Sequence, residues 1–97
     1  MYKIILEPRA KIELNQALLY YNELNINKLD FKFIVDFENA LDILEKNPFF
    51  GFKHEPYWSF KLRKFPYILI FRVIEELKLV AIESIFHTSQ NPTKHPK

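Results

Sequence analysis

Cysteine is absent from this sequence of 97 residues, and glycine occurs once, at Gly51. The lack of cysteine excludes disulfides, thiolate metal sites and cysteine nucleophiles. A single glycine excludes the glycine-rich loops that bind phosphates in P-loop and dinucleotide-binding proteins, because those loops need several glycines. We therefore expect an apolar core to stabilise the fold, and we expect no bound cofactor.

The histidines and serines do not follow the spacing of common metal or hydrolase motifs. His54, His87 and His95 lack the paired spacing of histidine zinc ligands on a helix. No serine lies in the glycine-flanked turn that presents the nucleophile in many hydrolases. The sequence therefore predicts neither a metal site nor a conventional catalytic triad.

Long apolar segments are missing as well. No uninterrupted apolar run is longer than that of residues 67–71, whereas a helix needs roughly 20 apolar residues to span a bilayer. At the start of the chain, Glu7 and Pro8 interrupt the sequence before a signal peptide of adequate length can form. We therefore expect a cytoplasmic protein without membrane contact.

Neither sign of charge dominates, since the formal net charge is +2. Residues 48–97 carry 8 basic and 4 acidic side chains, against 6 and 8 in residues 1–47, so an anionic partner should dock on the second half.

With 48% hydrophobic and 27% charged residues, the composition is that of one folded domain. We place this domain at residues 1–91 and a proline-containing tail at residues 92–97.

Hydrophobic periodicity predicts the order β-α-α-β-β-β. A strand at residues 2–6 is followed by a helix from Pro8 to about Leu24 and by a second helix that Asn27 caps and Asn47-Pro48 ends. Alternating patterns then indicate three strands, at residues 58–65, 67–74 and 78–87. The expected fold class is α+β, with a helical hairpin packed on one face of a mainly antiparallel sheet.

Alternation along the strands assigns side chains to the two faces of the sheet. The face toward the helices should hold Phe60, Leu62, Tyr67, Leu69, Phe71, Val80, Ile82 and Phe86. The other face should hold Lys61, Arg63, Ile68, Ile70, Arg72, Ala81, Glu83, Ile85 and His87. Isoleucines between cationic side chains favour a surface that contacts a partner.

The candidate for chemistry is a cationic cluster of Lys61, Arg63, Lys64 and Arg72, with His87 at the end of the last strand. Such cations can neutralise a phosphate while the imidazole moves a proton, which is the minimal equipment for cleaving RNA through its own 2′-hydroxyl. The alternative is structural: Lys61 pairs with Glu83 across the sheet, and His87 caps a strand end.

Aromatic side chains are concentrated in the same half. Nine of the chain's 16 aromatics lie between Phe49 and Phe71, interleaved with lysine and arginine. They can stack on nucleobases, or they can form core and partner interface.

Four features together resemble the RelE/ParE family of bacterial type II toxin-antitoxin toxins, the plasmid stabilisation family. They are the β-α-α-β-β-β order, the helix end at residues 44–48 (LEKNP) followed by Gly51, the basic strand at residues 60–67 (FKLRKFPY), and the ending at residues 85–92 (IFHTSQNP). The resemblance covers nearly the whole chain. It implies a small toxin that is neutralised by a cognate antitoxin in a hetero-oligomeric complex.

The resemblance implies one of two activities: cleavage of mRNA on the ribosome in RelE-like members, or inhibition of DNA gyrase in ParE-like members. Lys61 and Arg63 match basic positions on a strand of the RelE active site. However, Ile68 replaces a RelE-like arginine, and Thr88, Ser89 and Gln90 replace the basic residues after the last strand. We therefore expect a ParE-like toxin.

Two alternatives stay open. In the first, the chain is a metal-free ribonuclease in which Lys61 and Arg63 hold phosphate and His87 transfers protons. In the second, it is a non-toxic relic that still binds an antitoxin. In every case we expect an extended antitoxin segment to pair with an open sheet edge. The target or antitoxin is expected to contact Lys64, Ile68, Ile70, Arg72 and Ile85.

Overall fold

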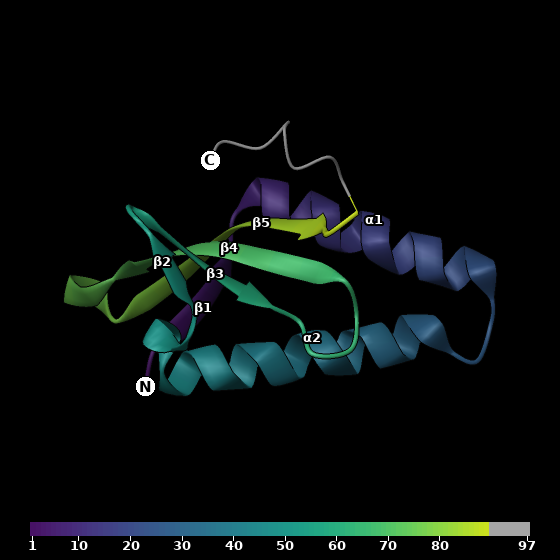
Figure 1. Ribbon diagram of the computed structural model, residues 1–97, viewed down its shortest axis with the longest axis horizontal. Helices are drawn as coiled ribbons and strands as arrows, with labels where there is room; N and C mark the ends of the chain where they lie inside the picture. The colour runs from purple at the N-terminus through teal and green to yellow at the C-terminus, as the bar shows by residue number, and fades with distance from the viewer. Residues whose placement is uncertain (90–97) are drawn as a thin grey trace.

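The computed structural model describes residues 1–89, so the expected tail at residues 92–97 and His95 lie outside the described part. Two α-helices form a hairpin, and a five-stranded sheet lies across one end of it (Figure 1). The elements are β1 (Lys3–Leu6), α1 (Pro8–Leu24), α2 (Leu29–Lys46), a 3₁₀ turn (Pro48–Phe50), β2 (Phe52–His54), β3 (Tyr57–Lys61), β4 (Tyr67–Ile74), a second 3₁₀ turn (Glu75–Leu77) and β5 (Leu79–His87).

The sheet has the order β1-β5-β4-β3-β2. β1 pairs with β5 in parallel, and every other neighbouring pair is antiparallel. The predicted α+β fold with a mainly antiparallel sheet is thus confirmed. Within residues 1–89, no helix is long and apolar enough to cross a bilayer.

The bounds of α1 agree with the prediction, whereas the start of α2 does not. Pro8 stands in the first turn of α1, where its missing N–H leaves no bond unmade. Asn27 does not cap α2, because its φ of 49° places it in the left-handed connection between the helices. Lys28, with a φ of 56°, is the cap residue and makes no side-chain capping bond. The hairpin turns through consecutive left-handed residues instead of an extended N-cap.

The core lies between the helix hairpin and one face of the sheet. α2 contributes Phe33, Phe37 and Leu44, and the sheet contributes Leu69, Phe71 and Ile82 among others. Tyr21, Phe33, Phe65 and Tyr67 form an aromatic cluster with ring centroids 5.0–6.3 Å apart. In a chain of this size, such aromatic burial supplies much of the favourable free energy of folding.

A β-bulge in β5 overturns the predicted faces beyond Ile82. Ile70 pairs with Ser84 while Phe71 pairs with Ile82, so Glu83 is an extra residue without an opposite partner. Beyond the bulge, Ile85 lies opposite Leu69, His87 opposite Tyr67 and Phe86 opposite Ile68. The predicted placement of Ile85 and His87 on the outer face, and of Phe86 on the helix face, is therefore wrong.

The region before β4 also differs from the prediction. β2 was not foreseen, because three residues between Gly51 and Pro56 are too short to show alternation. β3 ends at Lys61 instead of continuing to residue 65. The chain leaves the sheet there because the next residues form a loop that is bonded to α2.

Candidate functional site

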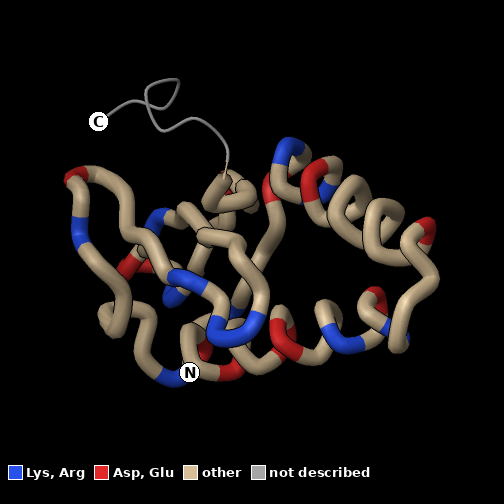
Figure 2. Tube along the Cα trace, turned by 45° about the vertical axis from the view of Figure 1, so that its right-hand side comes forward, with Lys and Arg blue, Asp and Glu red and all other residues tan. Residues whose placement is uncertain are grey.

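The last residue of β3 and the loop that follows it, together residues 61–66, carry the main cluster of cations and are here called the basic loop. Lys61, Arg63 and Lys64 are exposed, whereas Leu62 and Phe65 are buried in the core at 1% and 9% exposure. In Figure 2 the basic loop is the blue stretch that crosses α2. The loop thus holds its apolar side chains inward and presents three cations to solvent.

Asp36 on α2 holds the basic loop in place. This carboxylate is only 3% exposed, and its Oδ2 accepts hydrogen bonds of 2.9 Å from the backbone N–H groups of both Lys64 and Phe65. Leu62 donates its N–H to the carbonyl of Tyr67 at 2.9 Å, and Tyr67 donates to the carbonyl of Phe65 at 2.8 Å. The loop backbone is therefore fixed to the sheet and to α2 together.

The three cations of the basic loop make no ion pair within residues 1–89. The ion pairs in this part of the chain are Arg9–Glu13, Lys53–Glu55, Arg72–Glu83 and Lys78–Glu75. The alternative pairing of Lys61 with Glu83 is therefore wrong, because Glu83 binds Arg72 at 2.6 Å. Lys61 directs its Nζ instead to the carbonyl of Leu62, at 3.4 Å. Unpaired neighbouring cations are suited to bind an anion.

His87 lies beside the basic loop at the end of β5. Its ring contacts Tyr67 edge-on, with centroids 5.0 Å apart, and the next residue, Thr88, donates its N–H to the carbonyl of Pro66 at 2.7 Å. The Nδ1 of His87 accepts the N–H of Ser89 at 3.0 Å. This bond requires Nδ1 to be unprotonated, so a neutral His87 carries its proton on Nε2.

The outer face of the sheet adjoins the basic loop. Ile68 and Ile70 are half-buried there, and Arg72 lies on the same face in its ion pair with Glu83. The hydrogen bond to Glu83 raises the pKa of Arg72, so this guanidinium stays charged, and the carboxylate of Glu83 balances its charge. Ile85 is only 2% exposed, so its predicted role as a partner contact is wrong: the bulge turns it into the core.

The aromatic side chains divide between the two predicted roles. Phe65, Tyr67 and Phe71 belong to the core, whereas Phe50 and Phe52 are 68% and 77% exposed near the β2 edge. Trp58 is half-buried there, with the ammonium of Lys53 5.7 Å from its ring centroid.

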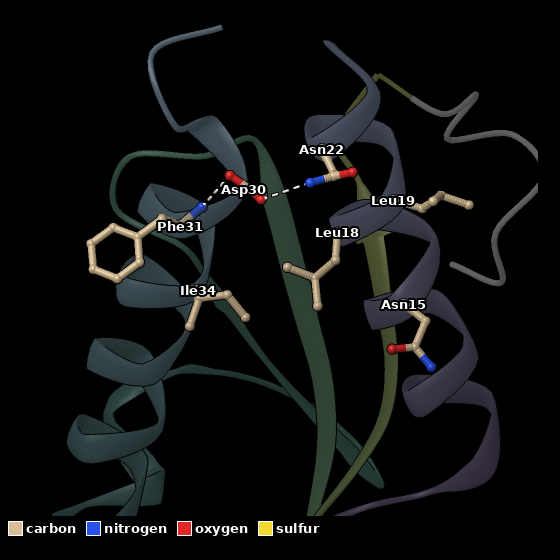
Figure 3. A pocket seen from close by; sticks show the side chains of 7 residues that line it. All are labelled: Asn15, Leu18, Leu19, Asn22, Asp30, Phe31 and Ile34. Carbon is tan, nitrogen blue, oxygen red and sulfur yellow. Dashed lines mark hydrogen bonds between the residues drawn. The ribbon is translucent and has the colours of Figure 1, made fainter. Parts of the chain in front are cut away.

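A shallow groove of about 530 Å³ lies between the helices near the tip of the hairpin (Figure 3). Leu18, Leu19, Phe31 and Ile34 line its apolar part. At its end, Asn22 donates to Asp30 at 3.1 Å, and this hydrogen bond lowers the pKa of the Asp30 carboxyl. In the described part of the chain, no group of three or more metal-binding side chains comes together.

Two residues that matter at this site were not predicted. Asp36 follows Phe33 by three residues and lies on the buried side of α2. A carboxylate among the apolar positions of a helix indicates a buried polar contact, so the sequence contained a signal for this residue. Glu13 on α1 binds the β5 bulge, and its position gave no comparable sign. Lys61, Arg63, Lys64 and Arg72, with His87, were predicted as one cluster, and the fold keeps only part of it. The three loop cations stay together, whereas Arg72 lies further along β4 in its ion pair with Glu83. His87 lies opposite Tyr67 on the helix face and does not share the outer face with Lys61, which lies opposite Ile68.

Comparisons with known proteins agree with this geometry. The family model of the ParE toxin of type II toxin-antitoxin systems (parDE) matches residues 4–92. No curated protein sequence matches the chain.

Solved toxin structures share the fold. The chain superposes on a chain of the chromosomal ParDE system from P. aeruginosa with a TM-score of 0.75 at 18% identity, covering 92% of this chain and 98% of that one. For the isolated E. coli RelE toxin the TM-score is 0.65 at 16% identity, with 96% and 90% covered. For the E. coli RelBE complex it is 0.65 at 17% identity, with 94% and 100% covered. Since the family model spans nearly the whole sequence, this chain belongs to the ParE toxin family of type II toxin-antitoxin systems.

Proposed function

We propose that this chain is a growth-inhibiting toxin that acts in the cytoplasm by binding DNA gyrase, and that a cognate antitoxin neutralises it. The observation that carries the proposal is the basic loop. Its three exposed cations have no carboxylate partner within residues 1–89, and its backbone is held by Asp36. A fixed cationic surface binds an anionic partner without first giving up an internal ion pair.

The binding role is favoured over RNA cleavage by the chemistry around the loop. Cleavage through the 2′-hydroxyl needs a base, an acid and charge stabilisation at the phosphate. Ile68 supplies a half-buried aliphatic side chain on the outer face where RelE-like enzymes carry an arginine. Among the described residues near the loop, His87 is the one imidazole. Its Nδ1 already accepts a hydrogen bond from the N–H of Ser89.

The antitoxin is proposed to use an open sheet edge and the outer face. β2 is an edge strand whose three residues are all exposed, and the half-buried Ile68 and Ile70 adjoin the loop cations. An extended segment can add a strand to such an edge, while acidic side chains of the same partner meet the cations of the loop. The solved RelBE and ParDE neighbours are toxin-antitoxin systems, which supports this partnership.

The test is inducible expression of the chain alone in a bacterial host, with plasmid supercoiling and mRNA integrity followed at early times. The loop variant Lys61→Ala/Arg63→Ala/Lys64→Ala removes the cations, which are exposed and make no ion pair in the described chain. We expect the native chain to arrest growth and alter supercoiling while messages stay intact, and the loop variant to permit growth. A matched control removes three exposed lysines elsewhere: Lys3→Ala/Lys11→Ala/Lys32→Ala. Equal relief of arrest by both variants would contradict a specific role of the loop.

A ribonuclease is the second candidate, because the residue after His87, Thr88, is hydrogen-bonded to Pro66 of the basic loop. Cleaved messages with unaltered supercoiling would favour it over gyrase binding. In that case His87→Gln should abolish cleavage while the loop and the fold remain. Absence of both effects from soluble, folded protein would indicate a non-toxic antitoxin-binding relic.

A further inference from the structure

We infer that Asp36 is a positioning residue for target binding, which acts by ordering the basic loop; this inference rests on the proposed function of that loop. Asp36 itself is 3% exposed and cannot reach a partner. Its effect passes through the backbone of Lys64 and Phe65, whose N–H groups it accepts at 2.9 Å each.

The geometry of these bonds explains why one side chain has this role. Lys64 and Phe65 lie in a loop, where no strand partner accepts their N–H groups. Asp36 accepts both with a single oxygen, and charged acceptors form stronger hydrogen bonds than neutral ones. Phe65 is thereby held in the core against Tyr21 and Phe33, with ring centroids 5.0 and 5.4 Å away. The cationic side chain of Lys64 leaves the same short segment toward solvent.

Electrostatic attraction and loop positioning predict opposite changes in binding affinity when Asp36 is replaced. Replacing Asp36 by a neutral residue removes a negative charge behind three cations, and Coulomb attraction alone would then strengthen the binding of an anion. Loss of the acceptor instead lets the loop sample other conformations, which weakens binding because the cations must be ordered again on contact. The sign of the change therefore separates the two effects.

The experiment compares Asp36→Asn and Asp36→Ala with the native chain. Asp42→Asn is the matched control, because it removes the same charge from an exposed position on α2. Inhibition of purified gyrase in a supercoiling assay is measured for each, together with amide hydrogen exchange at Lys64 and Phe65. We expect both amides to exchange faster in the Asp36 variants and inhibition to weaken, roughly tenfold in Asp36→Ala and by less in Asp36→Asn, whereas the control should match the native chain.

A double-mutant cycle distinguishes positioning from general destabilisation. In the background Arg63→Ala/Lys64→Ala, adding Asp36→Asn should cause little further loss, because the side chains that Asp36 positions are already gone. An equal loss in both backgrounds would overturn the inference. If Asp36→Ala fails to fold, Asp36→Asn carries the test, because its neutral amide oxygen is a weaker acceptor than the carboxylate.

Two failures are distinguishable. A native chain that does not inhibit gyrase would overturn the proposed function, and the exchange rates would still decide whether Asp36 orders the loop. A native chain that inhibits gyrase, together with an Asp36→Asn variant of equal or greater potency, would overturn the inference alone.

Discussion

The carboxylate of Glu13 accepts the backbone N–H of Ile85 at 2.8 Å, joining α1 to the bulged part of β5. β1 pairs with β5 only as far as Ile82, so the Ile85 N–H lies beyond the reach of that strand. The same oxygen of Glu13 accepts the hydroxyl of Ser84 at 2.9 Å. A helix side chain thus replaces the missing strand and stabilises the register that turns Ile85 into the core.

Glu13→Ala should lower the free energy of unfolding by about 1–3 kcal/mol, because it leaves a backbone donor and a hydroxyl without their acceptor. Denaturant unfolding measures this change. The control is Arg9→Ala, which removes only the exposed partner of Glu13, an arginine with 70% side-chain exposure, and should cost less than about 1 kcal/mol. Equal costs for the two variants would show that the bond to β5 contributes nothing beyond the surface ion pair.

Gly51→Ala should destabilise the fold by about 1–3 kcal/mol through steric overlap. A Cβ at this position would collide with the backbone carbonyl of Ser59 on β3, and a backbone atom cannot move aside as a flexible side chain can. Thermal and denaturant melts report the loss. Phe50→Ala, next to it and 68% exposed, should change stability by no more than about 0.5 kcal/mol. A Gly51→Ala chain as stable as the native one would refute the close approach of the Gly51 and Ser59 backbones.

Tyr67→Phe should weaken the loss of stability at alkaline pH. Burial, with the nearby Tyr21, raises the pKa of Tyr67 well above its ordinary value of 10.0. The unfolded chain therefore releases this proton near pH 10, whereas the folded chain holds it to higher pH. Stability from this group is complete below pH 10 and declines as the pH rises above it.

Urea unfolding of both chains between about pH 9 and pH 11 tests this expectation. The slope should be shallower for Tyr67→Phe but not zero, because burial also raises the pKa of Tyr21. Identical slopes for the two chains would mean that Tyr67 titrates alike in the folded and unfolded states.

Periodicity predicted the parts of the fold in which local pattern and tertiary contacts agree. The bounds of α1 and of β4 follow directly from the stripe that contains Ala17 and Tyr21 and from the alternation after Pro66. The second half of β5 could not be predicted, because one bulged residue reverses every later side chain. Glu13, whose carboxylate is hydrogen-bonded to this part of β5, lies 72 residues before Ile85 along the sequence.

The same reasoning applies to the candidate site. Lys61, Arg63 and Lys64 stand close in sequence, so their grouping was predictable from the chain alone. The end of β3 at Lys61 was not, since it depends on Asp36 from α2. A tertiary hydrogen bond here outweighs the strand pattern of residues 58–65.

The most direct test of the account is a supercoiling assay with purified gyrase and the purified chain, at low and at high salt. The account predicts that the native chain inhibits supercoiling, that the loop variant Lys61→Ala/Arg63→Ala/Lys64→Ala loses this inhibition while keeping its stability, and that added salt weakens the native effect. Undiminished inhibition by a folded loop variant would contradict the claim that the basic loop binds the target.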